Sequence, residues 1–142
     1  MTVAAILRGK GGEVVQVRPA DSVLSAVRLL AERRIGCVPV VDDGKVVGIF
    51  SERDLVYKVG EQGAAVLDRP VADVMTAPPI TIGDDTPIIH GLSLMTRRRV
   101  RHLPVVVDGQ LIGLVSIGDL VKYRIDRIES EAEALRNYIQ TA

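Results

Sequence analysis

The chain has 142 residues, of which 47% are hydrophobic, 25% are charged and 3% are aromatic. A formal net charge of +0 argues against a protein that holds a polyanion such as nucleic acid by nonspecific attraction. A single cysteine excludes an internal disulfide and favours a reducing, cytoplasmic location, and no apolar run approaches the about 18 residues that a membrane span needs.

The first half of the chain predicts the element order β-α-β-β-α. A β-branched stretch at 13–17 predicts a strand, and Asp21-Ser22 then caps a helix with apolar residues at helical spacing. Two further strands are expected at 37–42 and 45–50, joined by Asp43-Gly44, a dipeptide typical of tight hairpins. A second helix follows.

The second half repeats this order. Strands are predicted at 79–82, 102–107 and 110–115, with Thr86-Pro87 at the start of the intervening helix and Asp108-Gly109 at the hairpin turn. The strand prolines of both halves are expected at strand starts or edges.

Residues 33–56 align with residues 98–121 without a gap, at an offset of 65 residues. Two copies are too few for an open solenoid, so the repeat predicts a mixed α/β (α+β) fold with pseudo-twofold symmetry. We expect a first repeat with an N-terminal helix and linker at 1–70, a second repeat at 71–124, and a helical tail at 125–142.

The tail carries apolar residues at alternating spacings of four and three, which is a heptad pattern on a helix of about 20 residues. Two interpretations are open: the helix packs back on its own domain, or it pairs with its twin across a dimer axis. The residues of the pattern are Val121, Ile125, Ile128, Ala132, Leu135 and Ile139.

The tandem units resemble the CBS-domain family, named after cystathionine beta-synthase. The resemblance covers nearly the whole chain and is carried by the repeated segment, by "DVMTAPPITI" at 73–82, and by "RHLPVVVDGQLIGLVSIGDLV" at 101–121. It implies a flat module with two clefts that binds an adenosyl ligand (AMP, ADP, ATP, NAD or S-adenosylmethionine), forms a homodimer and regulates a partner.

A Ser-x-x-Asp sequence starts the last helix of each unit, at 51–54 and 116–119. It is nearly a capping box, in which the serine and the acidic residue bond to each other's backbone N–H groups. Such boxes prefer Glu or Gln, however, and Gly48 and Gly113 precede the serines where a close backbone approach is expected. Capping and ligand binding are compatible interpretations, because a capping serine can still donate its hydroxyl proton.

A nucleotide suits these residue types. The Asp54 or Asp119 carboxylate can accept hydrogen bonds from two ribose hydroxyls, and the Ser51 or Ser116 hydroxyl and helix N–H groups can reach a phosphate. Arg53 adds a cation to the first cleft only.

The resemblance implies further ligand residues. Arg101 and His102 match the basic residues before the Leu-Pro-Val strand, and we expect them to supply the positive charge of the second cleft. Arg97, Arg98 and Arg99 are interpreted as a solvated helix end, where cations favour the C-terminal dipole. The remaining candidates, each with an ordinary structural alternative, are Thr81, its expected counterpart Val17, Pro104 and Lys10.

The sequence has no cysteine and histidine cluster with metal spacing, no catalytic triad and no Walker loop, so we expect no metal and no enzyme. The main hypothesis is a cytoplasmic, homodimeric module that binds an adenine nucleotide and signals to a partner. The alternative is a ligand-free interaction module that acts through the heptad helix, with Ser-x-x-Asp serving only as caps. Nucleic-acid binding through 97–101 has the least support in a neutral chain.

Overall fold

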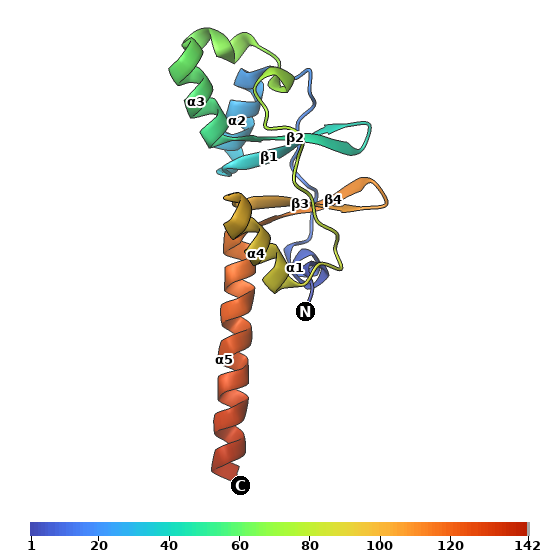
Figure 1. The fold of residues 1–142 in the computed structure, drawn as a ribbon, viewed down its shortest axis with the longest axis vertical. Coiled ribbons are helices and arrows are strands. Elements are labelled where there is room, and N and C mark those ends of the chain that lie inside the picture. The colour runs from blue at the N-terminus through green and yellow to red at the C-terminus, as the bar shows by residue number, and fades with distance from the viewer. Residues whose placement is uncertain (142) are drawn as a thin grey trace.

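The computed structural model of the chain describes residues 1–141. Two α+β units follow each other along the long axis, and a long helix extends from the second unit (Figure 1). The first unit contains α2 (Val23–Arg33), β1 (Cys37–Asp42), β2 (Lys45–Ser51) and α3 (Glu52–Gln62). The second contains α4 (Ile88–Arg98), β3 (His102–Val107), β4 (Gln110–Ser116) and the start of α5 (Ile117–Thr141). The connecting elements are α1 (Val3–Lys10) and two 3-10 helices, η1 (Ala64–Asp68) and η2 (Val71–Asp73).

Each unit holds one antiparallel hairpin, as the sequence predicted. In β1 and β2, Cys37 lies opposite Ser51, and in β3 and β4, His102 lies opposite Ser116. The turns match the prediction too, because Asp43 and Asp108 and the glycine after each have a positive φ, which is the geometry that closes two-residue hairpins. The mixed α+β fold of two repeats is thus confirmed.

In place of the strand predicted at 13–17, the structure has a single parallel bridge at Val17. The Val17 N–H donates to the Pro39 carbonyl at 3.1 Å, and the Val41 N–H donates to the Val17 carbonyl at 2.8 Å. Continuing this ladder toward Val15 requires an N–H on Pro39, which proline lacks. The proline therefore ends the pairing after a single residue.

The strand predicted at 79–82 is shortened in the same way. The Ile82 N–H donates to the Pro104 carbonyl at 3.0 Å, and the Val106 N–H donates to the Ile82 carbonyl at 2.8 Å. Pro104 again lacks the next donor. Both units thus hold their first segment by one bridge to the hairpin.

The segments that precede the two repeats pack crosswise. Val3 and Ile6 of α1 are buried in the core of the second unit, whereas Val71 and Val74 of the linker are buried in the core of the first. The sequence prediction grouped the N-terminal helix with the first repeat, and its packing differs from that expectation. Isolated backbone bridges from Thr2 to Pro87 and from Ser22 to Pro70 anchor the crossed segments.

The two strand glycines make room for these crossed segments. A Cβ atom on Gly48 would lie 2.5 Å from the Met75 sulfur, and one on Gly113 would lie 2.5 Å from Leu7 Cδ2. The close approach expected from the glycines exists, and it is made by the chain itself.

The helix α5 runs from the second unit away from the body of the protein (Figure 1). Leu120 near its start is fully buried, but every residue from Arg124 to Thr141 is exposed. The interpretation that the tail packs back on its own domain is therefore wrong.

Candidate ligand-binding clefts

Two cavities lie between the units. The first cavity, of about 660 Å³, has Ser51 and Asp54 in its wall, and the second cavity, of about 390 Å³, has Ser116 in its wall. Cys37 and His102, which begin the first strands of the two hairpins, line both cavities. Because both walls combine residues of both repeats, a ligand in either cavity would contact the two units at once.

The first Ser-x-x-Asp forms a complete capping box at the start of α3. The Ser51 N–H donates to Asp54 Oδ2 at 2.9 Å, and the Asp54 N–H donates to Ser51 Oγ at 3.2 Å. The Ser51 hydroxyl also donates to Asp54 Oδ2 at 3.1 Å, so its proton is already engaged. The Thr76 hydroxyl donates to Asp54 Oδ1 at 2.8 Å, which leaves one acceptor lone pair on that oxygen.

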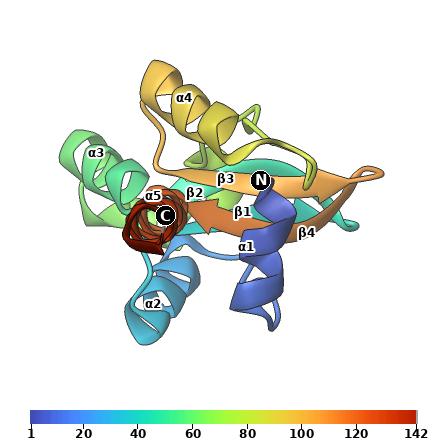
Figure 2. The ribbon, with the colours of Figure 1, turned by 90° about the horizontal axis from the view of Figure 1, so that it is seen from below.

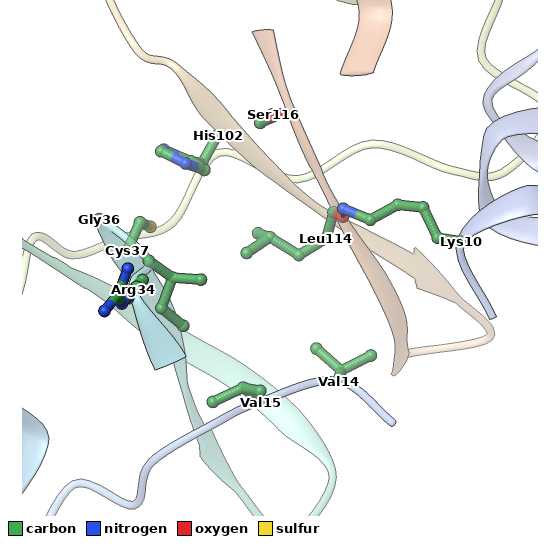
Figure 3. Close-up of a pocket in the computed structure, with 10 residues that line it drawn as sticks. Lys10, Val14, Val15, Arg34, Gly36, Cys37, His102, Leu114 and Ser116 are labelled. Atoms are coloured by element: carbon green, nitrogen blue, oxygen red, sulfur yellow. Dashed lines mark hydrogen bonds between the residues drawn. The ribbon is translucent and has the colours of Figure 1, made fainter. Parts of the chain in front are cut away.

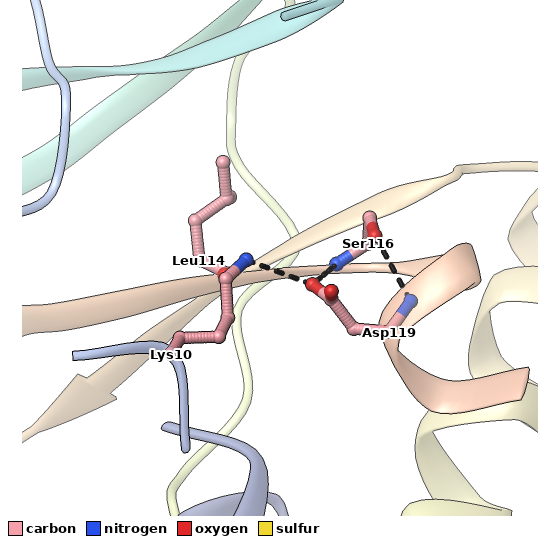
Figure 4. A network of polar contacts seen from close by, with 4 residues as sticks. All are labelled: Lys10, Leu114, Ser116 and Asp119. Atoms are coloured by element: carbon pink, nitrogen blue, oxygen red, sulfur yellow. Dashed lines mark hydrogen bonds and ion pairs between the residues drawn. The ribbon is translucent and has the colours of Figure 1, made fainter. Parts of the chain in front are cut away.

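The second Ser-x-x-Asp forms the same two backbone bonds at the start of α5. The Ser116 N–H donates to Asp119 Oδ2 at 2.9 Å, and the Asp119 N–H donates to Ser116 Oγ at 3.1 Å. The Lys10 ammonium donates to Asp119 Oδ2 at 2.8 Å and to the Leu114 carbonyl at 3.1 Å (Figure 4). Capping by both sequences is therefore confirmed, and the second carboxylate is also ion-paired.

The Lys10 contact sets the protonation of Asp119. Burial by itself raises the pKa of this carboxyl, but the hydrogen bonds from Lys10 and Ser116 and the charge of Lys10 together hold its pKa below the ordinary value. Asp119 is thus ionised at neutral pH.

Arginines gather at the first cavity. Arg53 lines it as predicted, and so do Arg98, Arg99 and Arg101. The structure differs from the assignment of Arg101 to the second cleft. The residue lines the first cavity, and its carbonyl accepts from the Ile117 N–H at 2.8 Å beside the second Ser-x-x-Asp. Arg98 is exposed in the last turn of α4, as a solvated helix end should be, and it also belongs to this wall.

The second cavity has fewer cations. Lys10 reaches it from one side and Arg34 from the other (Figure 3). Its floor includes the apolar side chains of Val14, Val15 and Leu114. The two clefts are chemically unequal, as expected, but the second draws its charge from Lys10 and Arg34.

Cys37 and His102 are both uncharged at neutral pH. Burial, and to a lesser extent the charge of Asp54, raise the pKa of the Cys37 thiol to about 12. Burial also lowers the pKa of His102, an effect that Lys10 and Arg101 reinforce and Asp119 opposes. His102 can therefore exchange hydrogen bonds with a ligand but adds no positive charge to either cleft at pH 7.

Four predicted ligand residues lie outside both cavities: Val17, Thr81, Pro104 and Asp119. Val17 is buried in the first core, and its structural counterpart is Ile82, because each makes the single bridge of its unit. The pairing of Val17 with Thr81 was wrong by one residue, and Thr81 is exposed. Pro104 is buried in β3.

The sequence analysis missed Thr76, Arg99 and Arg34. The last two are equivalent, since they lie 65 residues apart and each lines one cavity. The repeat alignment of 33–56 with 98–121 already pairs these two arginines, and this pairing was the available signal for them. Nothing local in the sequence indicates that Thr76 contacts Asp54, because that contact depends on the crossed linker.

Within residues 1–141, no group of three or more His, Cys, Asp or Glu side chains is placed to hold a metal ion. No helix in the same range combines the length and the apolar character needed to cross a membrane.

The fold and the paired cavities define a duplicated α+β module with two clefts between its repeats. The chain belongs to the CBS-domain family, whose model matches residues 11–61 and 71–126.

Relatives of the chain cover almost all of it. It is 33% identical to the mitochondrial CBS domain-containing protein CBSX3 of Arabidopsis thaliana, over 98% of this chain and 72% of that protein. The crystal structure of the CBS-domain protein ATU1752 from Agrobacterium tumefaciens has a TM-score of 0.83 at 42% identity, covering 87% of this chain and 99% of that one. The CBS domain protein PAE2072 from Pyrobaculum aerophilum, solved as a complex with AMP, has a TM-score of 0.75 at 26% identity, covering 84% and 89%.

Proposed function

We propose that the chain is a regulatory module that binds an adenine nucleotide between its repeats and signals to a partner protein. The observation that carries the proposal is the first cavity, in which Asp54 and a group of arginines line one space of about 660 Å³ between two units. AMP, ADP, ATP and NAD share the ribose and phosphate that such a site recognises. The complex of PAE2072 with AMP supports this ligand class.

The residues of the first cavity suit the two polar parts of a nucleotide. The Asp54 carboxylate accepts from one ribose hydroxyl on the Oδ1 lone pair that the capping box and Thr76 leave open. Arg99 and Arg101 donate to phosphate oxygens, for which the planar guanidinium is well matched. Exposed Tyr57 and the half-buried Ile80 offer apolar surface to the base.

Signalling follows from the position of the clefts between the units. A ligand that contacts both units favours the relative arrangement that it fits best, and the outer surface reports the change to a partner. Couplings of this kind are typically about 1–3 kcal/mol. We assign no catalytic step to the module, and the cytoplasmic location expected from the sequence stays a prediction.

Isothermal titration calorimetry with AMP, ADP, ATP and NAD tests the proposal. We expect heat of binding with at least one of them, and loss of the stronger site in Asp54→Ala. Since this substitution also removes a helix cap, Ser22→Ala is the matched control: Ser22 caps α2 by accepting from the Ser25 N–H at 3.0 Å and lines neither cavity. Absence of heat with all four nucleotides at millimolar concentration contradicts the proposal.

A second candidate function is a ligand-free interaction module in which Ser-x-x-Asp serves only as a cap. It is favoured by the observation that both aspartates already have protein partners. In that case Asp54→Ala lowers the free energy of unfolding by about 1 kcal/mol, as loss of a cap does, and leaves every nucleotide titration unchanged.

A further inference from the structure

A continuous apolar stripe covers the part of α5 that stands clear of the body. Its residues, here called the α5 seam, share an exposed position on one face of the helix, and the exposure of the large ones rises from 39% at Val121 to 65% at Ile139. Nothing within residues 1–141 covers the outer part of this seam (Figure 1). The α5 seam consists of Val121, Ile125, Ile128, Ala132, Leu135 and Ile139.

We propose that the α5 seam pairs with the α5 seam of a second copy of this chain, in parallel and in register, as a short two-stranded coiled coil. The spacings of four and three place Ile125, Ala132 and Ile139 at heptad position a. The d positions are then Val121, Ile128 and Leu135. The combination of isoleucine at a with leucine at d, which favours two strands, occurs at Leu135 and Ile139, so the choice of two strands rests on this last turn and on the flanking charges.

The charges beside the seam select the partner and its direction. In a parallel pair, the g residue of one helix lies beside the following e residue of the other. Arg124 then faces Glu129 of the partner subunit, and Glu131 faces Arg136 of the partner subunit. Both contacts join opposite charges, and each occurs twice by symmetry.

These charges are available for a partner. Within residues 1–141, Arg124, Glu129 and Arg136 make no ion pair in their own chain. Glu131 accepts from Arg127 Nε at 3.1 Å across one helical turn, and its carboxylate retains further acceptor capacity.

The antiparallel alternative brings like charges together. In the antiparallel register that pairs all seam residues, the flanking contacts run from e to e and from g to g. Glu129 then faces Glu129, Glu131 faces Glu131, and Lys122 faces Arg136. Like charges in these places oppose pairing, so the sequence of flanking charges favours the parallel arrangement.

The parallel arrangement also suits the shape of the chain. The first unit, the second unit and α5 follow each other along one axis (Figure 1), and α5 is seen nearly end-on in the perpendicular view (Figure 2). A twofold axis along α5 therefore places the first units of the two chains side by side, and the second units likewise. A seam of under about three heptads is marginal as an isolated coil, so the association requires the full chain.

Analytical ultracentrifugation of the full chain and two variants tests the surface. We expect Leu135→Asp to raise the dimer dissociation constant by more than about tenfold, because a seam leucine is replaced by a charge. Asn137→Asp is the matched control, since it adds the same charge on the outward face of the same helix turn and leaves the constant unchanged. A wild-type monomer at high micromolar concentration, or a dimer indifferent to Leu135→Asp, overturns the proposal.

Disulfide crosslinking tests the direction. Two copies of residue 139 meet at an a position only in the parallel, in-register pair, so Ile139→Cys is expected to form a disulfide-linked dimer under mild oxidation. The native Cys37 is only 3% exposed and does not compete. Crosslinking that appears only when Ile139→Cys is mixed with Val121→Cys shows antiparallel pairing and overturns the proposal.

Charge reversal tests the pairing partners. Arg124→Glu is expected to weaken the dimer by about fivefold, because it sets a new carboxylate beside Glu129 of the partner subunit twice. The double variant Arg124→Glu/Glu129→Arg restores the opposite charges and the affinity. Equal affinities in all three proteins contradict the proposed contacts. None of these measurements involves a nucleotide, so their outcome is independent of the proposed ligand binding.

Discussion

Lys10, the last residue of α1, holds Asp119 at the start of α5, with a distance of 2.8 Å between Nζ and Oδ2. The two residues are 109 positions apart in the chain. Asp119 caps α5 together with Ser116, and through Lys10 it also anchors the N-terminal helix on the second unit. Since Lys10 also lines the second cavity, the position of α1 and the charge of that cavity are linked.

Replacing Lys10 should make the protein more sensitive to acid. The pKa of Asp119 is lowered in the folded state, so Asp119 contributes stability above its unfolded pKa and loses it as pH falls through the folded pKa. In Lys10→Met the folded pKa rises, and acid unfolding followed by circular dichroism between about pH 2 and pH 5 should shift to higher pH. Arg8→Met, on the same helix and exposed, is the control. Identical acid curves for Lys10→Met and wild type contradict the assignment.

Alanine at Gly48 should destabilise the fold more than alanine at Gly113. The new methyl group at 48 meets the Met75 side chain and the Thr76 carbonyl at 3.1 Å, whereas at 113 it meets only the movable end of Leu7. Overpacking of this kind lowers the free energy of unfolding by about 1–3 kcal/mol, which urea titration measures.

Two variants check this reason. Gly60→Ala is the control, because a methyl group there meets nothing within 4 Å and should stabilise α3 by about 0.5–1 kcal/mol. Adding Met75→Ala to Gly48→Ala should cost less than the two single effects together. If the losses in unfolding free energy from Gly48→Ala and Met75→Ala simply add in the double variant, the Met75 side chain is not what the new methyl group at position 48 clashes with.

The features predicted from the sequence are those that depend on neighbours in the chain. The hairpin turn at Asp43-Gly44 and the cap at 51–54 are formed by residues within a few positions of each other, and their types alone predict them. The repeat at an offset of 65 also predicted which residues of the two units are equivalent.

What the repeat alone does not predict is how the units face each other. Arg101 follows α4 in the second repeat but lines the first cavity, whose wall combines residues of both units. Thr76 and Lys10 reach Asp54 and Asp119 through segments that pack crosswise. Such contacts depend on tertiary packing, which a pattern of spacings does not contain.

The Cys37 thiol should be inert in the folded protein. Burial raises its pKa to about 12, so the reactive thiolate is scarce at pH 8, and the side chain is 3% exposed. Alkylation by iodoacetamide should be at least about a hundredfold slower than in urea-unfolded chain. Ser25→Cys, on the exposed part of α2, provides a matched accessible thiol. Equal rates for Cys37 and this thiol contradict the buried position of Cys37 between the cavities.

The two clefts should differ in affinity for AMP, with the first cavity the stronger site. It is larger and has four arginines in its wall, whereas the second has Arg34 and a Lys10 already paired with Asp119. Because a phosphate bonds strongly to guanidinium groups, Arg99→Ala should lower the affinity of the stronger site by about tenfold or more, and Arg34→Ala should leave it unchanged. Arg97→Ala is the control, since Arg97 lies at the end of the same helix and lines neither cavity. If calorimetry instead finds the larger loss in Arg34→Ala, the nucleotide phosphate lies in the second cavity, and the order of the two sites is reversed.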